Sequence, residues 1–399
     1  MPISPKTRIL FVDDEDGVLT ALRLFMRRLG TEWDPHFVKS GPAALELMAR
    51  EPVDIVVSDM HMPEMTGAQL LNEVMRRHPR TVRLILTGYA DEATVLECVG
   101  TTHQWLSKPC NPLALQSNLR RIRSLQQRLA NEELRALVAQ MTHLPTFPAL
   151  FLKISEAMQS PHSSVHAIGE LISEDAALAA KVLQLANSAA FGATHSVDTA
   201  AEAVQMLGVN LIRALALAHH LFSAFQDRVC ELLPVGQMWE HGLQTAFLAQ
   251  QIVDLEPSQE HLREQVFTAG ILHDIGQLAL AANLPDQYAK VWAGGQPSNE
   301  RLLQAEHEMF QATHADVGAY LLGIWGLPVL MVEAVARHHE PAQSADRVFT
   351  PLTAVHVANA LAHAQTPLSQ ETFSSMVDAQ YLNQLGLSHR LGAWSALRQ

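Results

Sequence analysis

The chain has 399 residues, 48% of them hydrophobic and 17% charged, a composition typical of two or three packed domains and not of a disordered chain. Its net charge of −13 disfavours broad nucleic-acid binding, and we expect no direct contact with DNA. The three cysteines are too few for a disulfide framework, no apolar run approaches the roughly 20 residues of a membrane span, and the N-terminus enters a strand without a signal peptide pattern. We therefore expect a cytoplasmic protein with no membrane partner.

Five short apolar segments alternate with helical patterns over residues 1–125. These segments indicate strands, because they are rich in β-branched residues and end in charged or Pro/Gly-containing loops. The alternation predicts an α/β domain with a five-stranded, doubly wound, flavodoxin-like parallel sheet. We predict strands over 8–12, 36–39, 55–59, 82–87 and 103–106, and helices over 16–29, 42–50, 67–78 and 91–99.

Polar side chains follow the predicted strands, and they share one sheet edge because parallel strands all end there. They are Asp13, Asp14, Asp59, Thr87 and Lys108. Crowded carboxylates repel one another unless a cation joins them, and an oxygen-only site that keeps waters and a phosphate oxygen suits Mg²⁺. A carboxylate beside Mg²⁺ can attack a phosphoryl group to form an aspartyl phosphate. Lys108 and Thr87 would then bind the phosphate.

The same region resembles the receiver domain of two-component response regulators over about residues 6–125. The resemblance implies that Asp59 is the phosphoacceptor, that Asp13, Asp14 and Asp59 hold Mg²⁺, and that the backbone carbonyl of His61 is a further ligand. It rests on four motifs in order: Val12-Asp13-Asp14-Glu15, Ser58-Asp59-Met60-His61-Met62-Pro63, Leu86-Thr87-Gly88 and Ser107-Lys108-Pro109.

The resemblance also implies a switch and a partner. Thr87 and Trp105 match the switch pair that responds to phosphorylation, although Tyr or Phe is commoner at the position of Trp105, and Ala or Ser at that of Gly88. A sensor histidine kinase is the implied partner. The alternative is a degenerate receiver, which keeps the fold without being phosphorylated.

A continuous helical segment follows. Residues after Pro112 contain no helix breaker as far as about Met141 and are rich in Leu, Arg, Gln and Glu. Their apolar positions follow an a/d-like spacing that Gln126 interrupts. We predict that residues 126–141 form a helical connector, for which packing against its own domains is favoured over a coiled coil. A homodimer through the first domain or the connector stays open.

Residues 142–399 have helical spacing and no alternating strand pattern, so we predict an all-α domain of roughly ten or more helices. A helix is expected to start at Ser173–Asp175, and others to cover 200–207 and 210–222. A lone histidine on an apolar helix face is more often a hydrogen-bonded core residue. Several ligand-type side chains with one bridging carboxylate instead predict a pocket for Fe, Mn or Zn. They are His241, His273, Asp274, His314, His338, His339 and Asn359.

These residues belong to a second resemblance, to the HDOD domain over about residues 140–385. HDOD domains are relatives of the HD and HD-GYP phosphohydrolases and are regarded as signalling outputs without established hydrolytic activity. The matching segments are 172–178, 185–188, Leu272-His273-Asp274-Ile275-Gly276, 317–322 and Trp325-Gly326-Leu327-Pro328, which leads to His338-His339.

Departures from the catalytic relatives limit the expected chemistry. Asn359 stands where a metal carboxylate is expected, Gln277 stands where a catalytic HD-GYP domain has Lys, and no Gly-Tyr-Pro follows His339. A hydrolase needs charged metals and a phosphate clamp, so we expect an output that acts by binding a protein or nucleotide partner. The alternatives are a metal-dependent phosphodiesterase acting on a cyclic dinucleotide or another phosphoester, and a nucleotide sensor that does not cleave its ligand.

Overall fold

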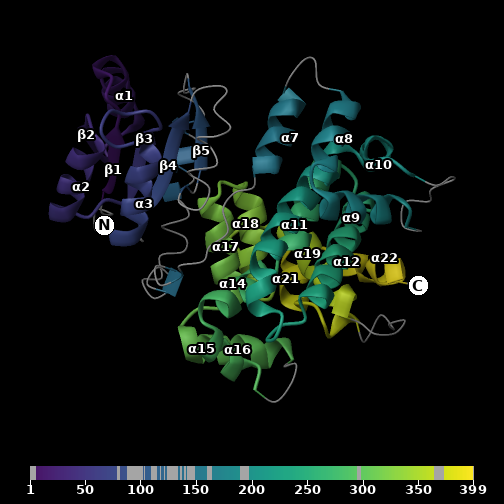
Figure 1. Ribbon diagram of the computed structural model, residues 1–399. Coiled ribbons are helices and arrows are strands. Elements are labelled where there is room, and N and C mark those ends of the chain that lie inside the picture. The colour runs from purple at the N-terminus through teal and green to yellow at the C-terminus, as the bar shows by residue number, and fades with distance from the viewer. Residues whose placement is uncertain are drawn as a thin grey trace. The chain divides into compact units, whose positions relative to one another are not determined.

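The structure is a computed structural model, and two compact units divide it along the chain, with the boundary between Phe147 and Pro148. We call the first the N-terminal unit and the second the helical unit, and describe each by itself (Figure 1). The described residues are 6–78, 81–87, 102, 104–108, 115–116, 118–120, 122–123, 134, 137–138, 141, 149–159, 164–188, 197–293, 298–363 and 373–398.

A five-stranded parallel sheet forms the centre of the N-terminal unit, in the order β2-β1-β3-β4-β5. This order confirms the predicted doubly wound α/β fold. Apolar β-branched residues fill the central strands because both faces of a parallel sheet are covered. The strands are β1 (Thr7–Val12), β2 (Trp33–Val38), β3 (Ile55–Asp59), β4 (Val82–Thr87) and β5 (Gln104–Ser107).

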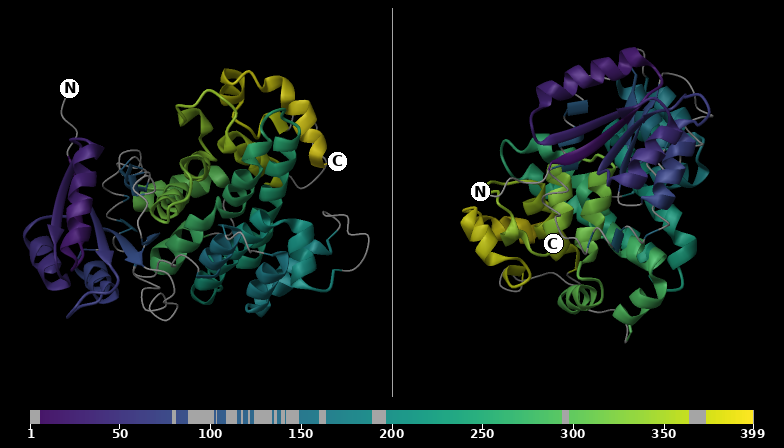
Figure 2. Two further views of the ribbon diagram at one scale, coloured as in Figure 1. Left: turned by 90° about the horizontal axis from the view of Figure 1, so that it is seen from above. Right: turned by 90° about the vertical axis from the view of Figure 1, so that its left-hand side faces the viewer.

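Helices cover both faces of this sheet, with α1 (Asp16–Leu29) on one side and α2 (Gly41–Arg50) and α3 (Gly67–Arg77) on the other (Figure 2). Leu10, Val56 and Ile85 belong to the core shared with α2 and α3. Alternate strand residues point to opposite faces, so their neighbours Ile9 and Phe11, also buried, face the side of α1. The two faces therefore have separate apolar layers.

Two predicted strands are displaced. The second starts at Trp33 rather than at residue 36, because Trp33 pairs with Thr7 and is buried. Pro35 lies inside it, which an edge strand such as β2 tolerates since one row of its N–H groups has no partner strand. The fifth strand lies one residue later than predicted, at Gln104–Ser107. The helix predicted over 91–99 lies outside the described residues, as does most of the connector predicted over 126–141.

The helical unit consists of α-helices and short 3₁₀ turns in its described part, which confirms the all-α prediction. The helices are α7 (Ala149–Gln159), α8 (Val165–Ser173), α9 (Ala176–Ala186), α10 (Ala200–Leu207), α11 (Val209–Val229), α12 (Val235–Asp254), α13 (Arg263–Leu272), α14 (Ile275–Asn283), α15 (Pro285–Val291), α16 (Asn299–Phe310), α17 (His314–Ile324), α18 (Val329–Arg337), α19 (Pro351–His363), α21 (Ala379–Gln384) and α22 (Leu391–Ser395).

Helix α13 packs against α11, α12, α18 and α19. Every residue of α19 from Pro351 to Ala362 is buried, the polar His356 and Asn359 included, so this helix has no exposed face between these residues. Helix α11 is longer than predicted, because Phe225 and Val229 continue its buried face beyond residue 222.

Local signals set several helix ends. Asp175 caps α9, since its carboxylate accepts the backbone N–H groups of Ala177 and Leu178 at 3.0 Å, whereas Ser173 ends the preceding helix. In the part of the chain that the structure describes, no single helix is long and apolar enough to cross a membrane. Helices α10 and α11 would reach that length and hydropathy only together, across a 114° bend.

Candidate functional site

Three carboxylates meet at the carboxyl edge of the sheet. Asp13 follows β1 directly and Asp59 ends β3, and the pairing of Val12 with Ser58 makes them neighbours. One oxygen each of Asp13, Asp14 and Asp59 lies within 4.8 Å of the others. Strand β1 lies between β2 and β3, the switch point at which open α/β sheets bind ligands. We call these three residues the carboxylate cluster.

Lys108 joins this cluster from the end of β5. Its Nζ lies 2.6 Å from Asp59 Oδ1 and 2.9 Å from Asp13 Oδ2. Partial burial disfavours the ammonium, but the hydrogen bonds to Asp59 and Asp13 outweigh it, so the pKa of Lys108 is raised above its ordinary value. The protonated lysine therefore bridges two carboxylates of the cluster.

The loop after Asp59 approaches closely from the other side. A Cβ on Gly67 would lie 2.1 Å from the backbone oxygen of Asp59, so only glycine fits there. The side chain of His61 in this loop is exposed. Thr87 ends β4 and Trp105 lies within β5, but the side chains of this predicted switch pair lie outside the described residues.

Histidines from several helices surround Asp274 in the helical unit, and we call this set the histidine cluster. Asp274 lies between α13 and α14 and belongs to two groups of ligand-type atoms, each within 4.8 Å. Its Oδ1 lies 3.1 Å from His314 Nε2 and 3.6 Å from His338 Nε2, and its Oδ2 lies 3.3 Å from His273 Nε2. One group is His241, His273 and Asp274, and the other is Asp274, His314, His338 and His339.

Two of these rings have a nitrogen that is buried without a partner. The Nδ1 atoms of His273 and His338 lie 2.7 Å from the carbonyls of Gly270 and Val335, so each ring donates Nδ1–H and presents the Nε2 lone pair to the cluster. Among the described residues, neither Nε2 has a hydrogen-bond partner. Such orphaned atoms are rare in folded proteins. A metal ion bound by each of the two groups would satisfy these atoms, and imidazole with one carboxylate suits Fe, Mn or Zn.

Asn359 lies against the histidine cluster at His241. Its Oδ1 lies 2.9 Å from His241 Nε2, so the amide and the imidazole satisfy each other. Position 359 therefore contributes no carboxylate to either group of ligand-type atoms. The half of the histidine cluster around His241 therefore has one carboxylate, Asp274, and a ring that is already hydrogen-bonded.

Sequence reasoning missed Glu306, which lies behind His314. Its Oε2 accepts both the backbone N–H and the Nδ1–H of His314, each at 2.8 Å. Its Oε1 accepts the hydroxyl of Tyr288 at 2.8 Å. One signal was available, because Glu306 lies on α16 between the buried Leu302 and Phe310, each four residues away, where a charged residue breaks the apolar face.

Close approach of glycines brings the helices together at the histidine cluster. A Cβ on Gly276 would lie 1.9 Å from the backbone oxygen of His314, so α14 and α17 touch along their backbones. A Cβ on Gly242 would lie 2.7 Å from the backbone oxygen of Ile271, which holds α12 equally close to α13. These contacts place His273 and Asp274 beside residues of distant helices.

Both halves of the chain match known families. Residues 9–120 match the response regulator receiver domain and residues 144–341 match the HDOD domain. The chain carries a receiver domain followed by an HDOD domain. The receiver domain makes it a two-component response regulator, and the HDOD domain is related to the HD phosphohydrolases.

Individual relatives resemble either domain. The hydrogenase transcriptional regulatory protein HoxA of Cupriavidus necator is 36% identical over 106 residues, 26% of this chain and 21% of that protein. A crystal structure of a candidate phosphohydrolase from Shewanella amazonensis matches with a TM-score of 0.53 and 24% identity over 68% of this chain and 94% of that one. An HDOD domain protein of unknown function from Geobacter sulfurreducens matches with a TM-score of 0.52 and 20% identity over 69% of this chain and 98% of that one. The two structures support the fold alone, and the chain spans less than half the length of the curated relatives it matches.

Burial and charge divide the HDOD histidines into two protonation states. Burial would lower the pKa of His314, but Glu306 and Asp274 on either side raise it to about 10. Burial lowers the pKa of His338 to about 4 and, with the neighbouring His273, that of His241 to about 4. Burial opposes the charge on Asp274 too, but the surrounding histidines hold its pKa well below the usual range. At physiological pH, His241 and His338 are therefore neutral, and His314 is an imidazolium.

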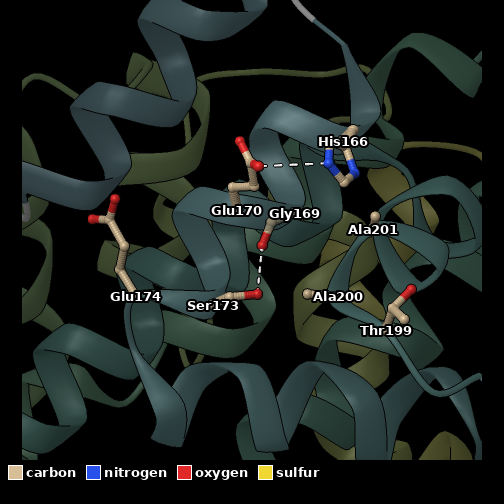
Figure 3. Close-up of a pocket in the computed structure, with 8 residues that line it drawn as sticks. All are labelled: His166, Gly169, Glu170, Ser173, Glu174, Thr199, Ala200 and Ala201. Carbon is tan, nitrogen blue, oxygen red and sulfur yellow. Dashed lines mark hydrogen bonds and ion pairs between the residues drawn. The ribbon is translucent and has the colours of Figure 1, made fainter.

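Two cavities open in the HDOD domain. One of about 470 Å³ is lined by His339, Arg337 and polar residues of α16 and α17, so it reaches the histidine cluster. The other, of about 390 Å³, lies between α8 and α10 (Figure 3). Among its polar lining residues, Ser173 Oγ donates to the Gly169 carbonyl at 2.8 Å and His166 pairs with Glu170 at 3.5 Å. The first cavity is the one that reaches the histidine cluster.

Proposed function

We propose that Asp59 accepts a phosphoryl group from a sensor histidine kinase and thereby controls an HDOD output that acts by binding. The observation that supports the phosphoacceptor most directly is the bridge from Lys108 to Asp59 and Asp13, at 2.6 and 2.9 Å. Asp14 is exposed at the same edge. The cluster is therefore open to a donor while its cation stays in place.

In the proposed reaction, an oxygen of Asp59 attacks the phosphorus of a phosphohistidine. The phosphorus–nitrogen bond breaks, its electron pair stays on the imidazole, and an acyl phosphate forms on Asp59. Lys108 binds the transferred phosphoryl oxygens through its ammonium. Receiver domains bind Mg²⁺, which would supply charge neutralisation here, and Asp13, Asp14 and Asp59, with the His61 carbonyl, are the residues that would hold it.

The output is proposed to bind a partner. Asn359 adds no charge to the histidine cluster and is hydrogen-bonded to His241. The amide side chain of Gln277, three residues after Asp274, is buried on α14. The missing carboxylate at Asn359 and the missing lysine at Gln277 leave the cluster with less of the charge that hydrolysis needs. In this proposal Thr87 and Trp105 form the switch pair, and residues 126–141 connect the receiver to the HDOD domain over 142–399. The partner is a protein or a nucleotide.

Acetyl phosphate labelling tests the phosphoacceptor. Full-length wild type and Asp59→Asn are incubated with acetyl phosphate and Mg²⁺, and intact-mass spectrometry counts phosphoryl groups. We expect one group on wild type and none on the variant. Asp16→Asn is the matched control, since Asp16 is an exposed aspartate whose carboxylate pairs with Lys39. Equal labelling of Asp59→Asn and wild type would refute the proposal, as would phosphorylation that changes neither partner binding nor oligomeric state.

A second candidate function is metal-dependent hydrolysis of a phosphoester. The observation in its favour is that Asp274 belongs to two groups of ligand-type atoms, as a bridging carboxylate does in two-metal hydrolases. A panel of cyclic dinucleotides and other phosphoesters, tested with Mn²⁺ or Fe²⁺, separates the two readings. Turnover that His273→Ala abolishes would establish hydrolysis. Binding without product would identify a sensor, and a metal-loaded protein without turnover would exclude the enzyme.

A further inference from the structure

Glu306 is a fully buried carboxylate in the HDOD domain, with 0% of its surface exposed. A buried charge is costly unless donors surround it. Three donors do so, namely the backbone N–H of His314, the ring Nδ1–H of His314 and the hydroxyl of Tyr288, each at 2.8 Å. Helices α15, α16 and α17 therefore meet at this one side chain.

The two bonds from His314 fix both the place and the orientation of its ring. Because Nδ1–H points to Glu306, Nε2 points to the histidine cluster, where it lies 3.1 Å from Asp274 Oδ1 and 3.1 Å from His339 Nε2. Two nitrogens bound to one zinc ion would be about 3.0 Å apart at right angles and about 3.4 Å apart in the tetrahedral geometry that zinc prefers, since zinc–nitrogen distances are about 2.1 Å. The spacing of His314 and His339 thus fits two ligands of one metal ion.

We propose that Glu306, held by Tyr288, is the positioning residue that presents His314 to a divalent metal ion bound by Asp274, His314, His338 and His339. The inference rests on the metal-binding part of the proposed function. Metal-bound histidines commonly donate their second N–H to a carboxylate, which fixes the ring and makes it a better ligand. The half of the cluster around His241 has an amide, Asn359, against its ring instead. The metal therefore belongs to the half that Glu306 supports.

A purely structural role as a helix cap is the competing explanation, because Glu306 also accepts the first backbone N–H of α17. That helix already has a second cap. Thr313 donates its backbone N–H and its hydroxyl to Asp316 at 3.0 and 2.9 Å, and Asp316 donates its N–H back to Thr313 Oγ1 at 3.3 Å. The ring bond of His314 to Glu306 adds nothing to capping, and it is the bond that matters for a metal.

Zn²⁺ titration of the full-length protein separates the two roles. The titration uses a competing chelator in millimolar Mg²⁺, which occupies the oxygen-only receiver site and is a poor match for imidazole. We expect Glu306→Gln to weaken Zn²⁺ binding by roughly 10–100-fold, and Tyr288→Phe to weaken it less. The Co²⁺ absorption spectrum, which reports the ligands, should change in Glu306→Gln. Glu256→Gln is the control, because Glu256 is a buried carboxylate bound to Arg390 and Trp394 at 2.7 and 3.0 Å.

The outcomes are distinct. The inference would be overturned in favour of a simple helix cap if the Glu306→Gln protein melts cooperatively, binds Zn²⁺ as tightly as wild type and has an unchanged Co²⁺ spectrum. If Glu306→Gln does not fold, Tyr288→Phe decides, since it retains the carboxylate, and wild-type Zn²⁺ affinity in it overturns the inference. A wild-type protein that takes up no Zn²⁺ would instead refute the metal-binding part of the proposed function, and the inference with it.

Discussion

The carboxylate cluster of the receiver and the histidine cluster of the HDOD domain both gather ionisable side chains, but they differ in ligand atoms and in exposure to solvent. The first has oxygen ligands only, and Asp14 and the partly exposed Lys108 leave it open to solvent. The second is built of imidazoles, of which His273 and His314 are 0% exposed. The open oxygen site suits Mg²⁺ and a phosphoryl donor, whereas the closed nitrogen site suits a retained transition metal. The two clusters therefore differ both in ligand atom and in exposure to solvent.

Each cluster also contains one protonated base that neutralises its carboxylates. In the receiver it is Lys108, between Asp59 and Asp13. In the HDOD domain it is His314, between Glu306 and Asp274. Lysine is a flexible point charge that can follow a phosphoryl group, whereas the ring of His314 is fixed at both nitrogens. The first cation is suited to move during a reaction and the second to give up a proton to a metal.

Removal of two HDOD ligands should have the largest effect. We expect His273→Ala combined with His338→Ala to lower transition-metal affinity at least roughly 100-fold, since even outer-shell partners contribute 10–100-fold, and to leave Asp59 labelling in Mg²⁺ unchanged. Elemental analysis of the purified full-length protein measures the first effect and intact mass the second. His219→Ala is the control, because His219 is a buried histidine that contacts Asp175 at 3.5 Å outside the cluster. If the double variant retains its transition metal, the histidine cluster does not hold the metal, and the proposed contrast between an oxygen site and a nitrogen site is wrong.

Loss of the lysine should be the next largest effect. Lys108→Met removes the ammonium beside Asp59, and we expect phosphorylation by acetyl phosphate to slow by roughly 100-fold, the usual effect of losing one preorganised donor to developing charge. The rate of adduct formation in Mg²⁺ measures it. Lys39→Met is the control, since Lys39 pairs with the exposed Asp16. A Lys108→Met rate equal to wild type would mean that the bridge is structural only.

The sequence predicted the receiver better than the HDOD cluster for a physical reason. Parallel topology forces every strand end to one edge, so Asp13, Asp59 and Lys108 could be brought together from strand positions alone. In a helical domain the partners of a side chain depend on tertiary packing. Glu306 lies on a different helix from His314 and hydrogen-bonds to Tyr288 of a third, which no spacing reveals.

Backbone contact between α14 and α17 should matter next. Gly276→Ala would place a methyl group 1.9 Å from the His314 carbonyl, so the helices must separate. We expect the HDOD domain to lose about 1–3 kcal/mol of unfolding free energy, as overpacked cores do, and metal binding to weaken with it. Denaturant unfolding measures the loss. Gly236→Ala is the control, because nothing lies within 4 Å of a Cβ there. Similar losses of unfolding free energy in both variants would show that the contact between α14 and α17 does not determine the geometry of the histidine cluster.

Asn359→Asp should have the smallest effect and is the sharpest test of the contrast within the histidine cluster. The amide oxygen accepts a hydrogen bond from His241 Nε2–H at 2.9 Å and brings no charge. A carboxylate there would add attraction for a metal at the His241 half, about 4 kcal/mol for unit charges 4 Å apart at an effective dielectric of 20, of which desolvation removes most. We expect a gain of roughly tenfold in metal affinity and a second metal equivalent in the elemental analysis. If the variant binds one metal as before, Asn359 is not what limits occupancy, and the two halves differ through Glu306 alone.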